Sequence, residues 1–211
     1  MQIIKFLIDF LLHLDVHLGQ IISNYGMATY AILFIIIFVE TGVVFFPFLP
    51  GDSLLFAAGA FAALGSLNIL PLIFLLVIAA VLGDTVNYWI GRFFGEKLIA
   101  NPKIPINEGH IKKTEEFFKK YGGKTIVLAR FVPIVRTFAP FVAGAGQMTY
   151  SRFIFFNVVG GVSWVLICSL AGFFFGNIPF VKENFSIVIL GIVLISIVPI
   201  AIEFIRHKLN K

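Results

Sequence analysis

The chain has 211 residues, of which 59% are hydrophobic and 13% are charged, and its mean hydropathy is +1.00. Soluble domains are about half apolar and about a quarter charged, whereas disordered chains combine low hydrophobicity with high net charge. The composition therefore excludes a disordered chain, argues against a soluble enzyme, and predicts an all-α membrane protein with several spans.

The net charge of +5 is concentrated in two parts of the chain. Residues 92–124 contain eight Lys or Arg against four acids, and residues 203–211 contain three against one. Because loops rich in Lys and Arg stay on the cytoplasmic side of a membrane, we expect this central loop and the C-terminus in the cytoplasm. No basic stripe alternates with aromatic residues, so we expect no nucleic-acid partner.

A single membrane domain is expected over residues 1–211, and its first element is a helix over residues 1–24. The polar residues of this helix, from Lys5 to Gln20, recur every three or four positions and therefore share one face. Such a face suits a helix that lies on the membrane surface, and it equally suits a span with one polar stripe.

Two apolar segments, residues 28–66 and 125–150, contain residues that break helices. Proline removes a backbone donor, and backbone that leaves the helix at membrane depth must be buried in protein or line a wet cavity. We therefore expect each segment to form a re-entrant hairpin, which enters and leaves the bilayer on the same side. The hairpin-breaking residues are Pro47, Pro50 and Gly51 in the first segment and Pro133, Pro140 and Gly144 in the second.

Three further segments are apolar and long enough to span a membrane: residues 67–91, 153–176 and 185–205. The loop before the second hairpin contains an amphipathic stretch at residues 106–121, in which Glu and Lys recur four positions apart. This stretch predicts a helix on the cytoplasmic membrane surface or, as the alternative, a solvated connector.

The two predicted hairpins also resemble each other in sequence. Residues 46–60 read FPFLPGDSLLFAAGA and residues 132–146 read VPIVRTFAPFVAGAG, and the spans that follow end in GRFFG and GFFFG. Because the first span ends in the cytoplasmic loop and the second ends outside, we expect two repeats of inverted topology. In many transporters built this way, the substrate site lies at the repeat interface near the bilayer midplane.

Five ionisable residues fall at membrane depth, where a charge is costly and therefore marks a candidate functional site. Arginine stays charged and presents a planar fork of donors, so Arg130 and Arg136 are the candidate ligands of an anionic phosphate. Low dielectric disfavours a carboxylate and a nearby arginine favours it, so such an acid can bind and release a proton. The candidate acids for proton coupling or ion pairing are Glu40, Asp52 and Asp84.

The alternative interpretation is that these charges form internal ion pairs that only hold the hairpins together. The four histidines show no metal-ligand spacing, and the sequence contains no nucleotide-binding or hydrolase motif. We therefore expect no metal, no cofactor and no catalytic residue, which argues against an enzyme.

Three sequence motifs occur in order between residues 28 and 176. They are Phe-Val-Glu40-Thr-Gly with Pro-Phe-Leu-Pro50-Gly51-Asp52-Ser53, then Gly83-Asp84-x-x-x-Tyr88-x-x-Gly91-Arg92, then Arg130-Phe-Val-Pro133-Ile-Val-Arg136-Thr137-Phe-Ala-Pro140-x-x-Ala143-Gly144, which is followed by Phe153 to Asn157 and by Trp164. Over this stretch the chain resembles the DedA family of bacterial inner-membrane proteins, which are related to the eukaryotic VTT-domain (SNARE-associated Golgi) proteins.

The resemblance implies two opposed re-entrant hairpins and a transporter in the bacterial inner membrane that is linked to the proton-motive force and supports envelope homeostasis. The implied substrates are lipids with an anionic phosphate head group, such as undecaprenyl phosphate or a phospholipid like phosphatidylethanolamine. The functional residues of the family correspond to Glu40, Asp52, Arg130 and Arg136. Two alternatives stay open: an exchanger of small ions or drugs for protons, and a membrane scaffold without transport. The sequence favours no oligomeric state.

Overall fold

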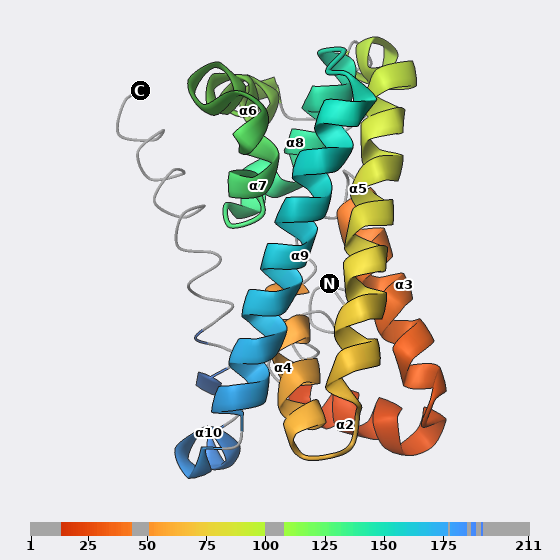
Figure 1. Ribbon diagram of the computed structural model, residues 1–211, viewed down its shortest axis with the longest axis vertical. Helices are drawn as coiled ribbons and strands as arrows, with labels where there is room; N and C mark the ends of the chain where they lie inside the picture. Colours follow the sequence, from red (N-terminus) through yellow and green to blue (C-terminus); the bar gives the residue numbers. More distant parts are fainter. Residues whose placement is uncertain are drawn as a thin grey trace, which may run out of the picture. The chain divides into compact units, whose positions relative to one another are not determined.

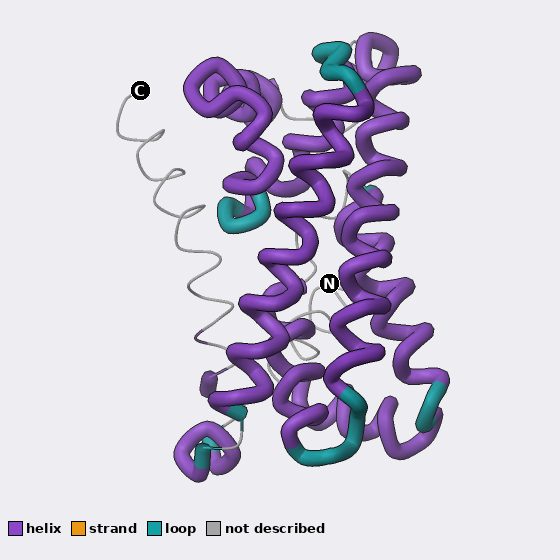
Figure 2. Tube along the Cα trace, in the orientation of Figure 1, coloured by secondary structure: helices purple, strands orange, loops and turns teal. Residues whose placement is uncertain are grey.

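A computed structural model describes residues 14–43, 51–99, 108–176 and 178–184, together with residues 187, 188 and 191. All regular elements of these described residues are helices, which confirms the expected all-α class (Figures 1 and 2). The contacts divide the chain into two compact units, and helices α3, α5 and α9 contribute residues to both. Several predicted features lie outside the described residues: the first 13 residues, Pro47, Pro50 and most of the span 185–205.

The first unit surrounds α4 (Gly51–Ala63), in which ten of the 13 residues are buried. The α5 helix begins after Asn68, whose Oδ1 accepts a hydrogen bond from the backbone N–H of Leu70 at 3.1 Å and so caps the helix. The backbone N–H of Asn68 donates to the Tyr30 hydroxyl at 2.7 Å, which ties this cap to α3. The other elements of the unit are α2 (Leu14–Tyr25), the start of α3 (Ala28–Gly42), the start of α5 (Ile69–Ile99), the end of α9 (Tyr150–Phe175) and α10 (Pro179–Glu183).

The second unit holds the rest of α3, α5 and α9 and four further elements: α6 (Glu108–Tyr121), the short 3-10 helix η1 (Gly122–Lys124), α7 (Thr125–Ala129) and α8 (Pro133–Ala145). Helices α6, α7 and α8 pack on one another in this unit (Figure 1). Its apolar core combines residues of α5, α7, α8 and α9: Tyr88, Ile126, Ala129, Val135, Ala139, Ala143 and Phe153.

The segment of the second predicted hairpin is broken between α7 and α8. Val132 has an extended backbone, with φ −124° and ψ 101°, as is usual for a residue before proline. Pro133 then opens α8 at a position where no backbone donor is needed. As a result, Arg130 lies in the turn that follows α7, and Arg136 lies in the first turn of α8.

The α8 helix continues through Pro140 and Gly144, so these two expected breakers do not interrupt it. A proline inside a helix is tolerated where neighbouring groups satisfy the backbone that it disturbs. Asn87 bonds the backbone beside the affected position, because its Nδ2 donates at 2.9 Å to the carbonyl of Thr137, one residue after the Arg136 carbonyl to which Pro140 cannot donate. Gly144 allows close packing instead, since a Cβ at this position would overlap the carbonyl oxygen of Tyr88 on α5.

Two helical stretches, Ile69–Gly95 and Tyr150–Phe175, are long and apolar enough to cross a membrane by length and composition. Only 33% of the apolar window of each stretch is buried, so most of its residues are at least partly exposed. A core helix of a soluble protein buries its apolar side chains, so this outward surface suits contact with lipid. On α5, exposed apolar residues recur every four positions and form one stripe: Leu70, Phe74, Ile78, Leu82 and Val86.

In each unit, one of the described helix crossings at which two backbones touch at a glycine has a counterpart in the other unit. A Cβ on Gly172 of α9 would overlap the carbonyl oxygen of Phe56 on α4, and a Cβ on Gly91 of α5 would overlap that of Phe141 on α8. Two further close contacts occur at each crossing, in the same order along the helices. In the first unit Gly59 contacts Ser169 and Ala60 contacts Gly176. In the second unit Gly144 contacts Tyr88 and Ala145 contacts Gly95.

Gly91→Ala is expected to lower the free energy of unfolding by about 1–3 kcal/mol, because α5 and α8 must move apart to admit the methyl group. Gly19→Ala in α2 is the matched control, since a Cβ there would meet only the Phe61 ring at 3.5 Å, an ordinary contact distance. The measurement is the denaturant midpoint of the purified protein in detergent. Equal midpoints for the two variants would contradict the close crossing.

Candidate functional site

Four of the five predicted membrane-depth charges come together in the second unit as two ion pairs. Nη2 of Arg130 lies 2.5 Å from Oδ2 of Asp84, and Nη2 of Arg136 lies 2.6 Å from Oε1 of Glu40. Glu40 comes from α3 and Asp84 from α5, whereas the arginines flank the break between α7 and α8. The break thus directs the two bases toward acids on two different helices.

The Arg130–Asp84 pair is almost fully enclosed, with 1% and 5% of the two side chains exposed. Asn157 of α9 completes it, because its Oδ1 accepts a hydrogen bond from Nη2 of Arg130 at 2.8 Å. The amide Nδ2 of Asn157 donates to the Val81 carbonyl at 3.0 Å and is thereby held in place. Nε and Nη1 of Arg130 are buried and form no hydrogen bond with the described residues, which leaves two unbonded donors beside the pair.

In the second ion pair, Arg136–Glu40, the arginine side chain is more exposed than the arginine side chain of the first pair. The Arg136 side chain is 9% exposed, against 1% for Arg130, whereas the Glu40 side chain is 2% exposed. The Arg136 side chain is therefore the less enclosed of the two arginine side chains.

Trp164 of α9 connects the two pairs. Its ring centroid lies 5.5 Å from Cζ of Arg130 and 5.2 Å from Cζ of Arg136, and the residue is 1% exposed. Cations at this distance are attracted to the negative face of an aromatic ring. Trp164 therefore helps to hold two like charges close together, which would otherwise repel each other.

Asn87 braces the backbone around both sides of the site. Its Nδ2 donates to the carbonyls of Thr41 on α3, at 3.2 Å, and Thr137 on α8, at 2.9 Å. These two threonines follow Glu40 and Arg136 directly in the sequence. One buried amide on α5 thus sets the spacing of the two segments that carry the second ion pair.

Of the other predicted site residues, Gly51 and Asp52 open α4 in the first unit. Pro47 and Pro50 are outside the described residues. Within the described part of the chain, no group of three His, Cys, Asp or Glu side chains could hold a metal ion.

The two acids and two arginines balance one another in charge. An incoming phosphate would add negative charge to this neutral cluster and would compete with a carboxylate for a guanidinium, which binds both kinds of oxyanion through the same fork. Charge balance would return if the displaced carboxylate took up a proton, because burial disfavours an unpaired carboxylate.

Sequence reasoning did not assign a site role to Asn87, Asn157 or Trp164. The two asparagines did carry a signal, because each is a polar side chain in an otherwise apolar span, and Asn87 lies about one helical turn after Asp84. Trp164 carried a signal only through the resemblance to the family, since an aromatic residue in an apolar helix is otherwise common. Its role depends on the position of both arginines in space.

Comparison with known proteins identifies relatives along most of the chain. The VTT domain family matches residues 49–174. Protein DedA of Escherichia coli strain K12 is 57% identical over 211 residues, which cover 99% of this chain and 96% of the relative. An uncharacterized membrane protein of Mycobacterium tuberculosis is 43% identical over 185 residues, or 86% of this chain and 81% of the relative. No solved structure matches.

A third relative is the inner membrane protein YqjA of Escherichia coli strain K12, which is 37% identical over 158 residues, or 74% of this chain and 71% of the relative. The relatives are named as membrane or inner membrane proteins, in agreement with the outward apolar surfaces of α5 and α9. The chain therefore belongs to the DedA family of membrane proteins and contains a VTT domain.

Proposed function

We propose that the protein is a transporter, not an enzyme, that moves a lipid with an anionic phosphate head group across the bacterial cytoplasmic membrane in exchange for protons. The observation that supports this most is the pair of arginines on the face of Trp164, each paired with a carboxylate. Undecaprenyl phosphate and phospholipids such as phosphatidylethanolamine share the required phosphate.

Arg136 is the proposed phosphate ligand. Its side chain is the more exposed of the two arginines, and its pairing with Glu40 can be exchanged for the phosphate. Arg130 is clamped by Asp84 and Asn157 and supplies a fixed positive charge nearby. Two adjacent guanidiniums attract a phosphate more strongly than one does, and the low dielectric around them increases the attraction.

Glu40 is the proposed proton carrier. When phosphate takes its place on Arg136, Glu40 loses its positive partner and takes up a proton, since a buried carboxylate is unstable without one. When the phosphate leaves, Glu40 releases the proton and returns to Arg136. Asp52, in the first turn of α4, is the corresponding acid of the first unit in this scheme.

The matching glycine crossings of the two units support two structural repeats, and we propose that these repeats have inverted topology with re-entrant hairpins. Transporters of this kind move substrate between repeats that open alternately to the two sides. In our scheme the basic segment that includes α6 faces the cytoplasm, following the bias of Lys and Arg toward that side. The acyl tail stays in the bilayer while the head group crosses, so a small protein suffices.

Glu40→Gln is expected to reduce proton-driven crossing at least about tenfold, since the amide cannot exchange a proton and replaces a charged partner worth about 1.5–3 kcal/mol. The measurement is the crossing of a lipid with a labelled phosphate head group in liposomes that contain the purified protein, with and without a proton gradient. Glu116→Gln, which removes an exposed carboxylate on α6, is the matched control. An unchanged response to the gradient in Glu40→Gln would contradict the proposed role of Glu40.

The same liposomes distinguish the alternatives. Ion flux without lipid crossing would identify an ion or drug exchanger. A scaffold would show neither lipid crossing nor ion flux, and a variant in which Glu40 and Arg136 are exchanged would fold normally. The buried Arg130–Asp84 pair favours the scaffold if the pair acts only to hold α5 against the turn after α7.

A further inference from the structure

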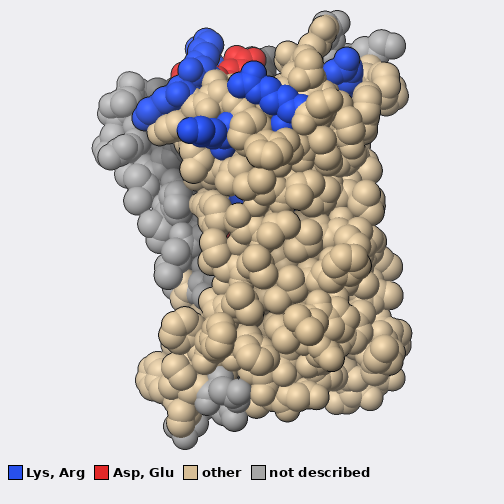
Figure 3. All heavy atoms as spheres, viewed as in Figure 1, with Lys and Arg blue, Asp and Glu red and all other residues tan. Residues whose placement is uncertain are grey.

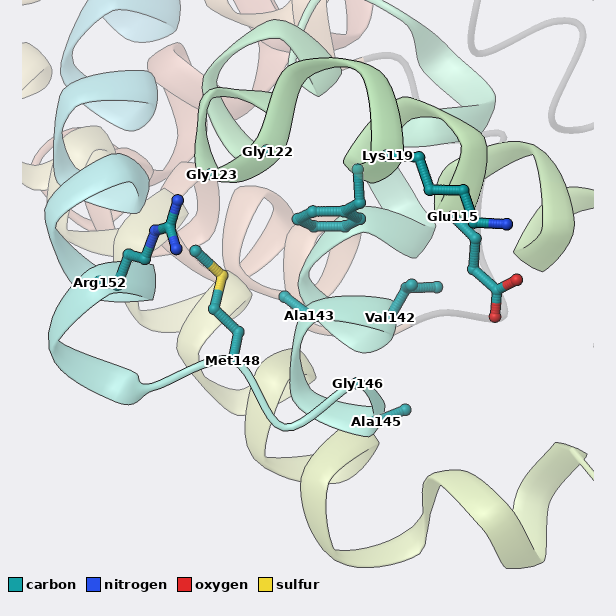
Figure 4. Close-up of a pocket in the computed structure, with 11 residues that line it drawn as sticks. Glu115, Lys119, Gly122, Gly123, Val142, Ala143, Ala145, Gly146, Met148 and Arg152 are labelled. Carbon is teal, nitrogen blue, oxygen red and sulfur yellow. The ribbon is translucent and has the colours of Figure 1, made fainter.

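A separate cavity of about 580 Å³ lies in the second unit, between α6, α8 and the start of α9 (Figure 4). This volume falls in the range of pockets that hold small molecules, about 300–1,000 Å³. Its floor is apolar and includes Phe118, Val142, Ala143 and Met148. None of the residues of the two ion pairs lines it, so it is distinct from the site described above.

Two basic side chains stand on opposite sides of this cavity. Figure 4 shows Arg152 of α9 on one side and Lys119 of α6 on the other, with Val142 and Ala143 between them. Among the described residues, no carboxylate forms an ion pair with Arg152 or with Lys119, although Glu115 precedes Lys119 by one turn and also lines the rim. The rim therefore carries a net positive charge that the described residues do not neutralise.

The Arg152 guanidinium lies against the backbone of the two glycines that follow α6. A Cβ on Gly123 would lie 3.1 Å from Nε of Arg152, and one on Gly122 would lie 3.8 Å from its Nη2. Gly122 also has a φ of +58°, which favours glycine at this turn. Because the two glycines have no side chains, the Arg152 guanidinium can lie close to their backbone at the wall of the cavity.

The surroundings of the cavity resemble a membrane interface. Lys and Arg side chains gather over this part of the second unit (Figure 3), and its exposed bases include Arg92, Lys112, Lys120 and Lys124. Two exposed tyrosines, Tyr121 and Tyr150, lie at the end of α6 and the start of α9. Tyrosine is enriched at the level of lipid head groups, and basic clusters attract anionic lipids.

We propose that this cavity binds one anionic phospholipid of the surrounding membrane, with its phosphate between Lys119 and Arg152 and the first part of its acyl chains over the apolar floor. A free phosphate would use the basic rim but would leave the floor unused, whereas an amphiphile satisfies both. The site holds a resident lipid rather than a transported one, and it does not depend on the proposed transport.

The test counts lipids on the purified full chain by mass spectrometry of the intact protein, with dioleoyl phosphatidylglycerol and dioleoyl phosphatidylcholine as competing probes. The wild type is expected to retain one phosphatidylglycerol in preference. Lys119→Gln/Arg152→Gln should weaken the binding of phosphatidylglycerol about thirtyfold, which is about fivefold for each basic side chain. Glu115→Gln removes a negative charge from the rim and should strengthen the binding about fivefold. Lys112→Gln/Lys124→Gln removes the same charge outside the cavity and should change binding less than about twofold.

Three outcomes would overturn the proposal: equal retention of both lipids, an equal loss in the two double variants, or displacement of the lipid by millimolar glycerol phosphate, which would assign the site to a soluble anion. Arg136→Ala should still retain the lipid even where it stops transport. A failure of transport and a failure of this cavity to bind lipid are therefore distinguishable.

Discussion

Arg136→Ala is expected to slow lipid crossing about 30- to 1,000-fold, which corresponds to about 2–4 kcal/mol for one partner of a buried charge pair. The reason is that the Arg136 guanidinium is the more accessible of the two that meet at Trp164, and alanine removes both its charge and its fork of donors. Arg136→Lys should fall between wild type and alanine, because an ammonium keeps the charge but loses the paired geometry. The measurement is the liposome assay at equal protein incorporation.

Alanine at this position also leaves the Glu40 carboxylate buried without its partner, which by itself destabilises a protein. The double variant Glu40→Gln/Arg136→Ala removes both charges and separates the two effects. It should unfold like the wild type in detergent and still fail to move lipid. Transport at the wild-type rate by this double variant would show that Arg136 has only a structural role. Lys112→Ala on α6 is the control for a lost surface charge and should transport normally.

Asp84→Ala is expected to lower the free energy of unfolding by about 3–5 kcal/mol, the typical cost of breaking a buried ion pair by removing one partner. Arg130, with 1% of its side chain exposed, would then keep Asn157 as a hydrogen-bond acceptor but would lose the carboxylate that the described residues provide. Asp84→Asn should cost less, because the amide oxygen can still accept from Arg130. The measurement is the denaturant midpoint and slope in detergent.

Two further variants show whether this loss comes from the stranded charge. Asp84→Leu/Arg130→Met replaces the whole pair with apolar side chains and should recover most of the lost stability, because it leaves no buried charge. Glu116→Ala removes an exposed carboxylate and should change stability by less than about 0.5 kcal/mol. If Asp84→Ala proved as stable as Glu116→Ala, the pair would not contribute to folding.

The helices are the part of the fold that the sequence predicts best. An apolar run without breakers forms a helix at membrane depth because its backbone has no other way to satisfy its hydrogen bonds. The described helices α5 and α9 accordingly overlap the predicted spans 67–91 and 153–176. The α5 helix runs on to Ile99, past the predicted end, since Gly95 does not break it but packs against Ala145 of α8.

Breaks are harder to predict, because the same residue type has opposite effects at two positions. Pro133 opens α8, whereas Pro140 lies inside it. Near Pro140 the backbone receives a hydrogen bond from Asn87, about fifty residues earlier in the chain. A local pattern cannot contain that information, because the donor arrives only through the packing of α5 against α8.

The sequence by itself determined the class of protein and the set of candidate residues, since a charge in an apolar span is conspicuous and arginine chemistry favours phosphate. Only the tertiary structure decided which acid meets which base. Any of three acids could have paired with either arginine, because Coulomb attraction depends on the distance in space and not on the separation in sequence. The packing of α3 and α5 around the turn before α8 selects Asp84 for Arg130 and Glu40 for Arg136, and it places Trp164 against both.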